Sequence, residues 1–189
     1  MITTGDRKQN SYGSAWKARL LVGLALLGAV LTFGIPAARD FAARTSVAAG
    51  ADALLEALNT ARMEALNRNA QVTICKSSSS RGRFPTCVDS TAEWSEGWVV
   101  FLDRGAIGAI DPSDKVISTG RSSGKVESVS ERPTRLASIT FNPVGPITGP
   151  TATLEVRLAS SVTQGTFERV ICLSVLGRAH IAKAGSCEA

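Results

Sequence analysis

The hydrophobic positions of this chain follow three successive patterns. From Leu20 to Ala38, nineteen residues carry no charge, and apolar side chains fall on every face of a helix. From Arg39 to Asn69, apolar residues recur at steps of three and four, which is the spacing of an amphipathic helix. Beyond this point the spacing changes to two, which is typical of β-strands. No cluster of turn residues separates the first two patterns, so the sequence predicts one long helix from Ala15 to Asn69, followed by a β-rich region.

The first pattern has the length and composition of a membrane span. A hydrocarbon core of about 30 Å needs ~20 helical residues, and Leu20 to Ala38 supplies nearly that number. A lone span must be helical, because every backbone N–H in lipid has to be paired within the segment. Pro36 removes one of these donors near the outer end. Residues 15–38 are therefore predicted to be the transmembrane part of the helix.

The flanking charges predict the orientation of this span. The segment from Met1 to Arg19 has four basic residues and one acidic residue, a larger positive excess than the stretch just after the span. This excess places the N-terminus in the cytoplasm, where we expect residues 1–14 to be a disordered leader. Two other interpretations are a buried core helix and a cleaved secretory signal. The length of the apolar run and its continuation as a helix favour a retained anchor.

The second pattern predicts that one stripe of the helix packs on a sheet. Charged and amide side chains fall largely off this stripe. Asn67, Arg68 and Asn69 predict the end of the helix, because a cation is favourable near the negative end of the helix dipole. The stripe consists of Val47, Ala51, Leu54, Leu55, Leu58, Ala61, Ala65 and Leu66.

The third pattern predicts short strands separated by Gly and Pro. Short strands with short links favour antiparallel pairing, in one or two sheets. The predicted fold class is therefore α+β, with a long N-terminal helix packed on antiparallel sheet and with residues 39–189 as a single head domain. Trp98–Leu102 is hydrophobic throughout and is expected to be central. The predicted strands are Gln71–Cys75, Trp98–Leu102, Lys115–Ser118, Lys125–Val129, Ser138–Phe141, Thr153–Leu158, Arg169–Val175 and Ala179–Ala182.

All four cysteines, Cys75, Cys87, Cys172 and Cys187, lie beyond the predicted span. An even number of cysteines in an exported domain predicts two disulfides, for which three pairings are possible. We expect the sequential pairing, Cys75–Cys87 and Cys172–Cys187, since each bond closes a small loop beside a strand and contributes roughly 3 kcal/mol on the chain-entropy model. The cysteine spacings match no zinc pattern, and a single histidine cannot supply two ligands, so we expect no metal site.

The chain offers few groups for catalysis. A nucleophilic Ser or Cys needs a neighbouring base, but His180 is the only histidine and no GxSxG motif is present. We therefore expect a protein that is not an enzyme, without catalytic residues, cofactor or small-molecule substrate. Trp94 and Trp98 flank a Ser-Glu-Gly turn. A binding platform is one interpretation of this pair, but we expect core packing, because large aromatic residues that start a central strand usually fill the core.

The segment from Asp103 to Asp114 partly resembles a calcium loop. Its acidic residues and one glycine fall at suitable positions for such a loop. Two ligand positions are taken by Gly105 and Ile107, which have no side-chain oxygen. We therefore expect an acidic turn between two strands.

Basic residues near the C-terminus form a candidate DNA-binding site. Arg178 and His180 alternate on one predicted strand and would share a face, with Lys183 close behind. Phosphate binding depends on clustered cations, whereas much of the net charge of +5 belongs to the segment before the span. If the three side chains converge, we expect weak, salt-sensitive binding of double-stranded DNA without base readout. The alternative is a solvated strand face.

Several segments are similar to the FimT/GspH family of minor pilins and pseudopilins. Residues 94–103, WSEGWVVFLD, resemble the family signature WSxGWxVFxD, and residues 141–145, FNPVG, resemble its FxPxG turn. Residues 58–75 resemble its junction between helix and strand. Residues 176–181, LGRAHI, resemble its C-terminal GRxR segment. The similarity extends from about Leu20 to the end of the chain.

This resemblance implies a helix whose hydrophobic start packs into a filament core, and a β-rich head in the periplasm. It implies a structural subunit of a type II secretion system or a type IV pilus, anchored as a single-pass protein in the bacterial inner membrane. Its partners would be other pilins of the same filament and membrane lipid. Some FimT proteins bind DNA during natural transformation, so a DNA-binding minor pilin is the alternative function.

The N-terminus departs from the family pattern. The mature helix of the family begins G-F-T-x-x-E, in which the glutamate neutralises the N-terminal amine of a neighbouring subunit. Counting back from Pro36, the glutamate position falls at Arg19, which has the wrong sign, and the processing site falls near Ser14 or Gly13. Either this start is degenerate, or the protein is not processed and polymerised in the usual way. A second departure is His180, because the DNA-binding members have arginine there.

Overall fold

The computed structural model describes residues 12–80, 82–83, 85–122, 126, 128–149, 153–162, 165–182 and 187. Most of the predicted leader, residues 1–11, lies outside the described residues, as does Lys183. The chain divides into two compact units, residues 1–41 and residues 42–189.

The N-terminal helix has three segments. Helix α1 spans Tyr12–Ala29, the π-helical segment η1 spans Val30–Gly34, and helix α2 spans Ile35–Arg68. The helix thus begins at Tyr12 rather than at the predicted Ala15. It ends as expected near Asn69, which has a positive φ of 49° and stops the helical turn. The part from Trp16 to Arg68 is long and apolar enough, by length and composition, to cross a membrane.

The π-helical segment is a feature that the sequence analysis did not anticipate. It ends at Gly34, two residues before Pro36, whose ring clashes in an α-helix with the carbonyl four residues earlier, that of Thr32. A wider helical turn at this point relieves the clash. The Thr32 hydroxyl donates to the carbonyl of Gly28 at 2.9 Å, which keeps that polar side chain satisfied within an apolar segment.

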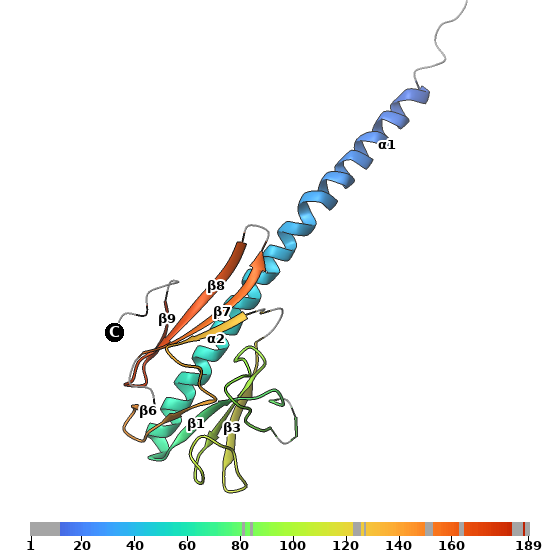
Figure 1. Ribbon diagram of the computed structural model, residues 1–189. Coiled ribbons are helices and arrows are strands. Elements are labelled where there is room, and N and C mark those ends of the chain that lie inside the picture. The colour runs from blue at the N-terminus through green and yellow to red at the C-terminus, as the bar shows by residue number, and fades with distance from the viewer. Residues whose placement is uncertain are drawn as a thin grey trace, which may run out of the picture. The chain divides into compact units, whose positions relative to one another are not determined.

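The second unit contains two antiparallel sheets (Figure 1). Their strand orders are β3-β2-β1-β5-β6 and β4-β7-β8-β9, and every strand pair in the described part of the chain is antiparallel. This confirms the predicted α+β class and the central position of β2. The strands are β1 Val72–Lys76, β2 Trp98–Leu102, β3 Lys115–Gly120, β4 Ser128–Arg132, β5 Ser138–Phe141, β6 Ile147–Thr148, β7 Leu154–Val162, β8 Gly165–Leu173 and β9 Ala179–Ala182.

Strands β7 and β8 extend further toward the turn that joins them than predicted, whereas β8 ends at Leu173 and not at the predicted Val175. They pair over nine residues each, from Leu154 opposite Leu173 to Val162 opposite Gly165. The extension contains Ser160 and other polar residues, which interrupt the apolar pattern that marks a strand in the sequence. Backbone hydrogen bonds across the hairpin stabilise this extension, although its side chains show no apolar pattern.

One hydrophobic core joins α2 to both sheets within the second unit. The predicted stripe is largely confirmed, but Leu66 is 40% exposed and Leu55 only partly buried. Gly50 and Ala57 are buried although they are not part of the predicted stripe, and a Cβ added to Gly50 would lie 2.9 Å from the Ser122 hydroxyl oxygen. The buried residues of α2 are Val47, Gly50, Ala51, Leu54, Ala57, Leu58, Ala61 and Ala65.

Candidate functional site

The tryptophan block at the start of β2 belongs to the core. Trp94 is 1% exposed and Trp98 is 3% exposed. The Trp98 indole lies over Gly120, its partner on β3, where an added Cβ would come within 2.6 Å of the ring. Because both rings are covered, the block confirms the core-packing interpretation and leaves no aromatic platform for a ligand.

A buried ion pair links the two sheets. Lys76 at the end of β1 contacts Glu131 on β4, and both side chains are fully buried. The Lys76 ammonium also lies 3.4 Å from the carbonyl oxygen of Ser90 and 5.6 Å from the centre of the Trp94 ring. The second oxygen of Glu131 accepts the N–H of Leu136 at 2.8 Å. This pair could not be predicted from the sequence, because the two residues are 55 positions apart and no motif connects them.

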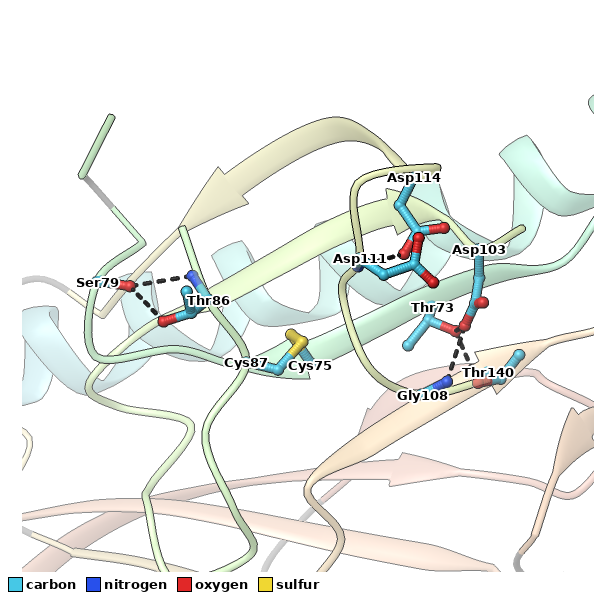
Figure 2. Close-up of a disulfide and its surroundings, with 10 residues drawn as sticks. All are labelled: Thr73, Cys75, Ser79, Thr86, Cys87, Asp103, Gly108, Asp111, Asp114 and Thr140. Atoms are coloured by element: carbon cyan, nitrogen blue, oxygen red, sulfur yellow. Dashed lines mark hydrogen bonds between the residues drawn. A yellow bond between two sulfur atoms is a disulfide. The ribbon is translucent and has the colours of Figure 1, made fainter. Parts of the chain in front are cut away.

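The acidic loop after β2 is closed by its own hydrogen bonds (Figure 2). A carboxylate oxygen of Asp103 accepts the Thr73 hydroxyl at 2.6 Å. Asp111 accepts the hydroxyl and the N–H of Ser113, and these bonds lower the pKa of the Asp111 carboxyl, the hydroxyl contributing most. Asp114 accepts the N–H of Asp111 at 2.8 Å. The carboxylates therefore stabilise the turn by accepting hydrogen bonds. Among the described residues, no group of three or more His, Cys, Asp or Glu could hold a metal ion.

The two disulfides follow the sequential pairing. Cys75 on β1 joins Cys87, with Cα atoms 5.5 Å apart, and Cys172 on β8 joins Cys187, with Cα atoms 5.4 Å apart. The first closes the loop after β1, which hydrogen bonds between Ser79 and Thr86 also hold together (Figure 2). The first disulfide therefore fixes the loop after β1 to a buried strand, and the second fixes Cys187 to β8.

Two of the three predicted DNA-binding residues, Arg178 and His180, lie at the β9 edge of the second sheet. Arg178 directly precedes β9, and His180 lies on it opposite Cys172 of β8. Both side chains are exposed, whereas Ala179 and Ile181 pack against the core. Strand alternation thus places Arg178 and His180 on the solvent side. Lys183, the third predicted residue, lies outside the described residues, so whether the three side chains converge stays a prediction.

The neighbouring strands carry a group of one basic and two acidic side chains on this side of the sheet. Arg157 on β7 contacts Glu155 at 2.8 Å and Glu168 of β8 at 3.2 Å. The hydrogen bond that Arg157 donates to the Glu155 carboxylate, supported by the charge of Glu168, raises the pKa of the Arg157 guanidinium. Because two carboxylates surround one cation, this part of the face would repel phosphate. On this face, the described residues of the predicted DNA-binding site are therefore confined to the β9 edge.

The two C-terminal signature segments meet in space. Gly145 has a φ of 104° and Gly177 a φ of 75°, conformations that favour glycine. A Cβ added to Gly177 would lie 2.2 Å from the Gly145 carbonyl and 3.3 Å from the Phe141 ring. The N–H of Ile147 donates to the carbonyl of Val175 at 3.1 Å and joins the two sheets. The two segments therefore form a packed junction between the sheets.

The comparisons with known proteins agree with this architecture. The family model of the type II transport protein GspH matches residues 50–177, more than half of the chain. The crystal structure of the type IV minor pilin FimU from Pseudomonas aeruginosa, in space group P21, has 18% sequence identity and a TM-score of 0.54, covering 77% of this chain and 95% of FimU. A second FimU crystal form, in space group P65, has 18% identity and a TM-score of 0.49, covering 72% and 93%.

No curated protein matches the chain. The FimU likeness shows the pilin-like fold, in which one long helix packs on antiparallel sheets. The family match includes the tryptophan block at residues 94–103 and the turn at residues 141–145. The chain therefore belongs to the GspH family of type II transport proteins.

Proposed function

We propose that this protein is a minor pilin or pseudopilin, a structural subunit that is anchored in the bacterial inner membrane by its N-terminal helix. The observation that carries the proposal is an apolar helix joined to a head of the GspH family. The family describes type II transport, whereas FimU is a type IV minor pilin. We therefore propose that the subunit serves either in a type II secretion system or in a type IV pilus.

The surface of the first unit supports a lipid or filament environment. Leu20, Leu21 and Leu24 are 60%, 67% and 68% exposed. A continuous apolar surface of this kind is rare in soluble proteins and marks a membrane or protein contact. Lipid would cover these side chains in the anchored subunit, and the helices of other pilins would cover them in the filament. The positive charge before the span favours a cytoplasmic N-terminus and a periplasmic head.

Membrane anchoring is tested by alkaline extraction of cells that express the full chain. We expect the protein in the membrane pellet. The double variant Leu24→Asp/Leu27→Asp should move into the soluble fraction, because each central aspartate costs about 2.5–3.5 kcal/mol on insertion. Leu66→Asp, at an exposed position of α2 in the head, is the matched control and should stay in the pellet. Recovery of the wild-type chain from the soluble periplasm would refute the anchor.

Processing and assembly are tested on the native protein. Intact mass reports whether the chain is cut near Gly13 or Ser14, near the end of the apolar run, or not at all. Cleavage after the run would make the protein a released periplasmic protein. A retained chain should co-purify with other minor pilins, and a deletion strain should lose piliation or secretion. Normal assembly in that strain would refute the structural role.

DNA capture is a second candidate function, favoured by the exposure of Arg178 and His180 at a sheet edge. We expect a gel shift of duplex DNA at low salt that weakens as salt rises. Arg178→Ala and Lys183→Ala should weaken the shift to a similar extent for different sequences, and Arg104→Ala, another exposed arginine, should not. No shift at low salt would exclude this function.

A further inference from the structure

Two arginines and a phenylalanine gather where the β7–β8 hairpin lies beside α2. The guanidinium carbon of Arg44 lies 5.6 Å from the centre of the Phe167 ring, and that of Arg169 lies 5.4 Å from it. Both arginines are exposed, and Phe167 is half-buried. Figure 1 shows the two long strands running alongside α2, which is how residues so far apart in the sequence meet. We call these three residues the arginine–phenylalanine cluster.

The charge around the cluster favours an anion. Stacking on an aromatic face holds a guanidinium plane in place and leaves its N–H edge available to a phosphate. Glu168, beside Arg169 in the sequence, lies on the other side of β8, where it contacts Arg157 at 3.2 Å. Asp40 precedes Arg44 by one helical turn and offsets part of its charge. Two cations near one ring repel each other, and an anion bound beside them lowers this repulsion.

The chain connection limits how far the cluster can lie from lipid. Arg44 follows Ala38, the last residue of the uncharged run, by six residues (44 − 38). Six residues extend about 9 Å as an α-helix and about 22 Å when fully extended. The headgroup layer adds roughly 5–8 Å on each side of the hydrocarbon core. Helix α2 includes residues 38–44, so the helical distance applies. If the run spans the bilayer, as the proposed function requires, the long Arg44 side chain can therefore reach the periplasmic headgroups.

We propose that Arg44, Phe167 and Arg169 form a binding site for the phosphate of an anionic phospholipid headgroup. Each guanidinium would bind phosphate oxygens through paired, charge-assisted N–H···O bonds. The Phe167 ring would lie at the boundary of headgroup and acyl chain, where an aromatic side chain is favourable. The site would hold the β7–β8 hairpin against the bilayer and would set the orientation of the head before the subunit enters a filament.

The test is hydrogen–deuterium exchange of the full chain in nanodiscs. One set of discs contains phosphatidylcholine alone, and the other contains added phosphatidylglycerol. In the anionic discs we expect several-fold slower exchange in the segment 165–170, and high salt should reduce the effect. Arg44→Gln/Arg169→Gln should abolish this protection. Arg104→Gln/Arg121→Gln, which removes the same charge from two other exposed positions, should keep it.

The other possible results distinguish the lipid site from the membrane anchor and from a site for other anions. Equal exchange in both discs, with the chain incorporated, would overturn the lipid site and leave the membrane anchor intact. Failure of the chain to enter either disc would refute the anchor and the site together. If inorganic phosphate in neutral discs gave the same protection, the cluster would be a free-anion site. If duplex DNA in neutral discs gave it, the cluster would bind nucleic acid; either result would overturn the lipid assignment.

Discussion

The buried pair of Lys76 and Glu131 provides a direct test of what joins the two sheets. Both side chains are fully buried, so neither charge regains water when its partner is removed unless the head opens. Glu131→Gln leaves the ammonium with the Ser90 carbonyl and the Trp94 ring. Lys76→Met leaves the carboxylate with the N–H of Leu136. Each single variant therefore keeps one buried and poorly compensated charge.

The expected size of the effect follows from this burial. Breaking a buried pair on one side costs about 3–5 kcal/mol. For a domain of this size each kcal/mol lowers Tm by ~2–4 °C, so each single variant should lose roughly 6–20 °C. The double variant Lys76→Met/Glu131→Gln removes both charges and keeps an acceptor for the Leu136 N–H. It should lie within about 2 kcal/mol of the wild type, because neutral replacement of a buried pair is often nearly neutral in free energy.

The assay is thermal and urea unfolding of the full chain in detergent, with both disulfides oxidised and tryptophan fluorescence as the signal. The matched control is Glu64→Gln/Arg68→Gln, which removes a partly exposed pair on α2 and should change the free energy of unfolding by no more than about 1 kcal/mol. The reasoning would be refuted if the single variants at the buried pair were as mild as this control. It would also fail if the double variant were as unstable as the sum of the singles.

Three further changes act on other parts of the head. Gly120→Ala should destabilise it by about 1–3 kcal/mol, measured as Tm, because the new methyl group meets the Trp98 indole at 2.6 Å. Replacing the Cys172–Cys187 disulfide by two serines should cost about 3 kcal/mol for this loop length, measured as the urea midpoint. Asp111→Asn should make the free energy of unfolding less dependent on pH under acidic conditions. Hydrogen bonds from Ser113 lower the pKa of Asp111, so its contribution is present above the ordinary value of 3.8 and is lost as pH falls through the lowered value.

Each of these changes has its own control. Thr119→Ala, next to Gly120 on β3, removes side-chain atoms without approaching the indole, and an equal loss of Tm in both variants would contradict the steric argument. Reduction of the wild-type disulfides should lower the urea midpoint at least as far as the Cys172–Cys187 variant does. For Asp111, an unchanged pH profile of the asparagine variant between the ordinary pKa and more acidic conditions would contradict the assigned role.

The local patterns of the sequence determined much of this fold. The uncharged run, the three-and-four spacing of α2 and the hydrophobic strand Trp98–Leu102 each depend on neighbouring residues alone, and the structure reproduces them. The same holds for the family assignment, because the signature residues 94–103 are contiguous. Antiparallel pairing also followed from the sequence, since short links between strands leave little room for crossovers.

Tertiary structure alone decided the features that depend on distant partners. Lys76 and Glu131 meet because β1 and β4 end close together in different sheets. Both side chains are fully buried, so each charge depends on the other for compensation. Arg44 and Arg169 share one aromatic ring because the β7–β8 hairpin extends through polar residues. Hydrogen bonds between strands stabilise such an extension without any apolar pattern. Periodicity reports which face of an element is buried, but the identity of the group opposite is set by the packing of the whole head.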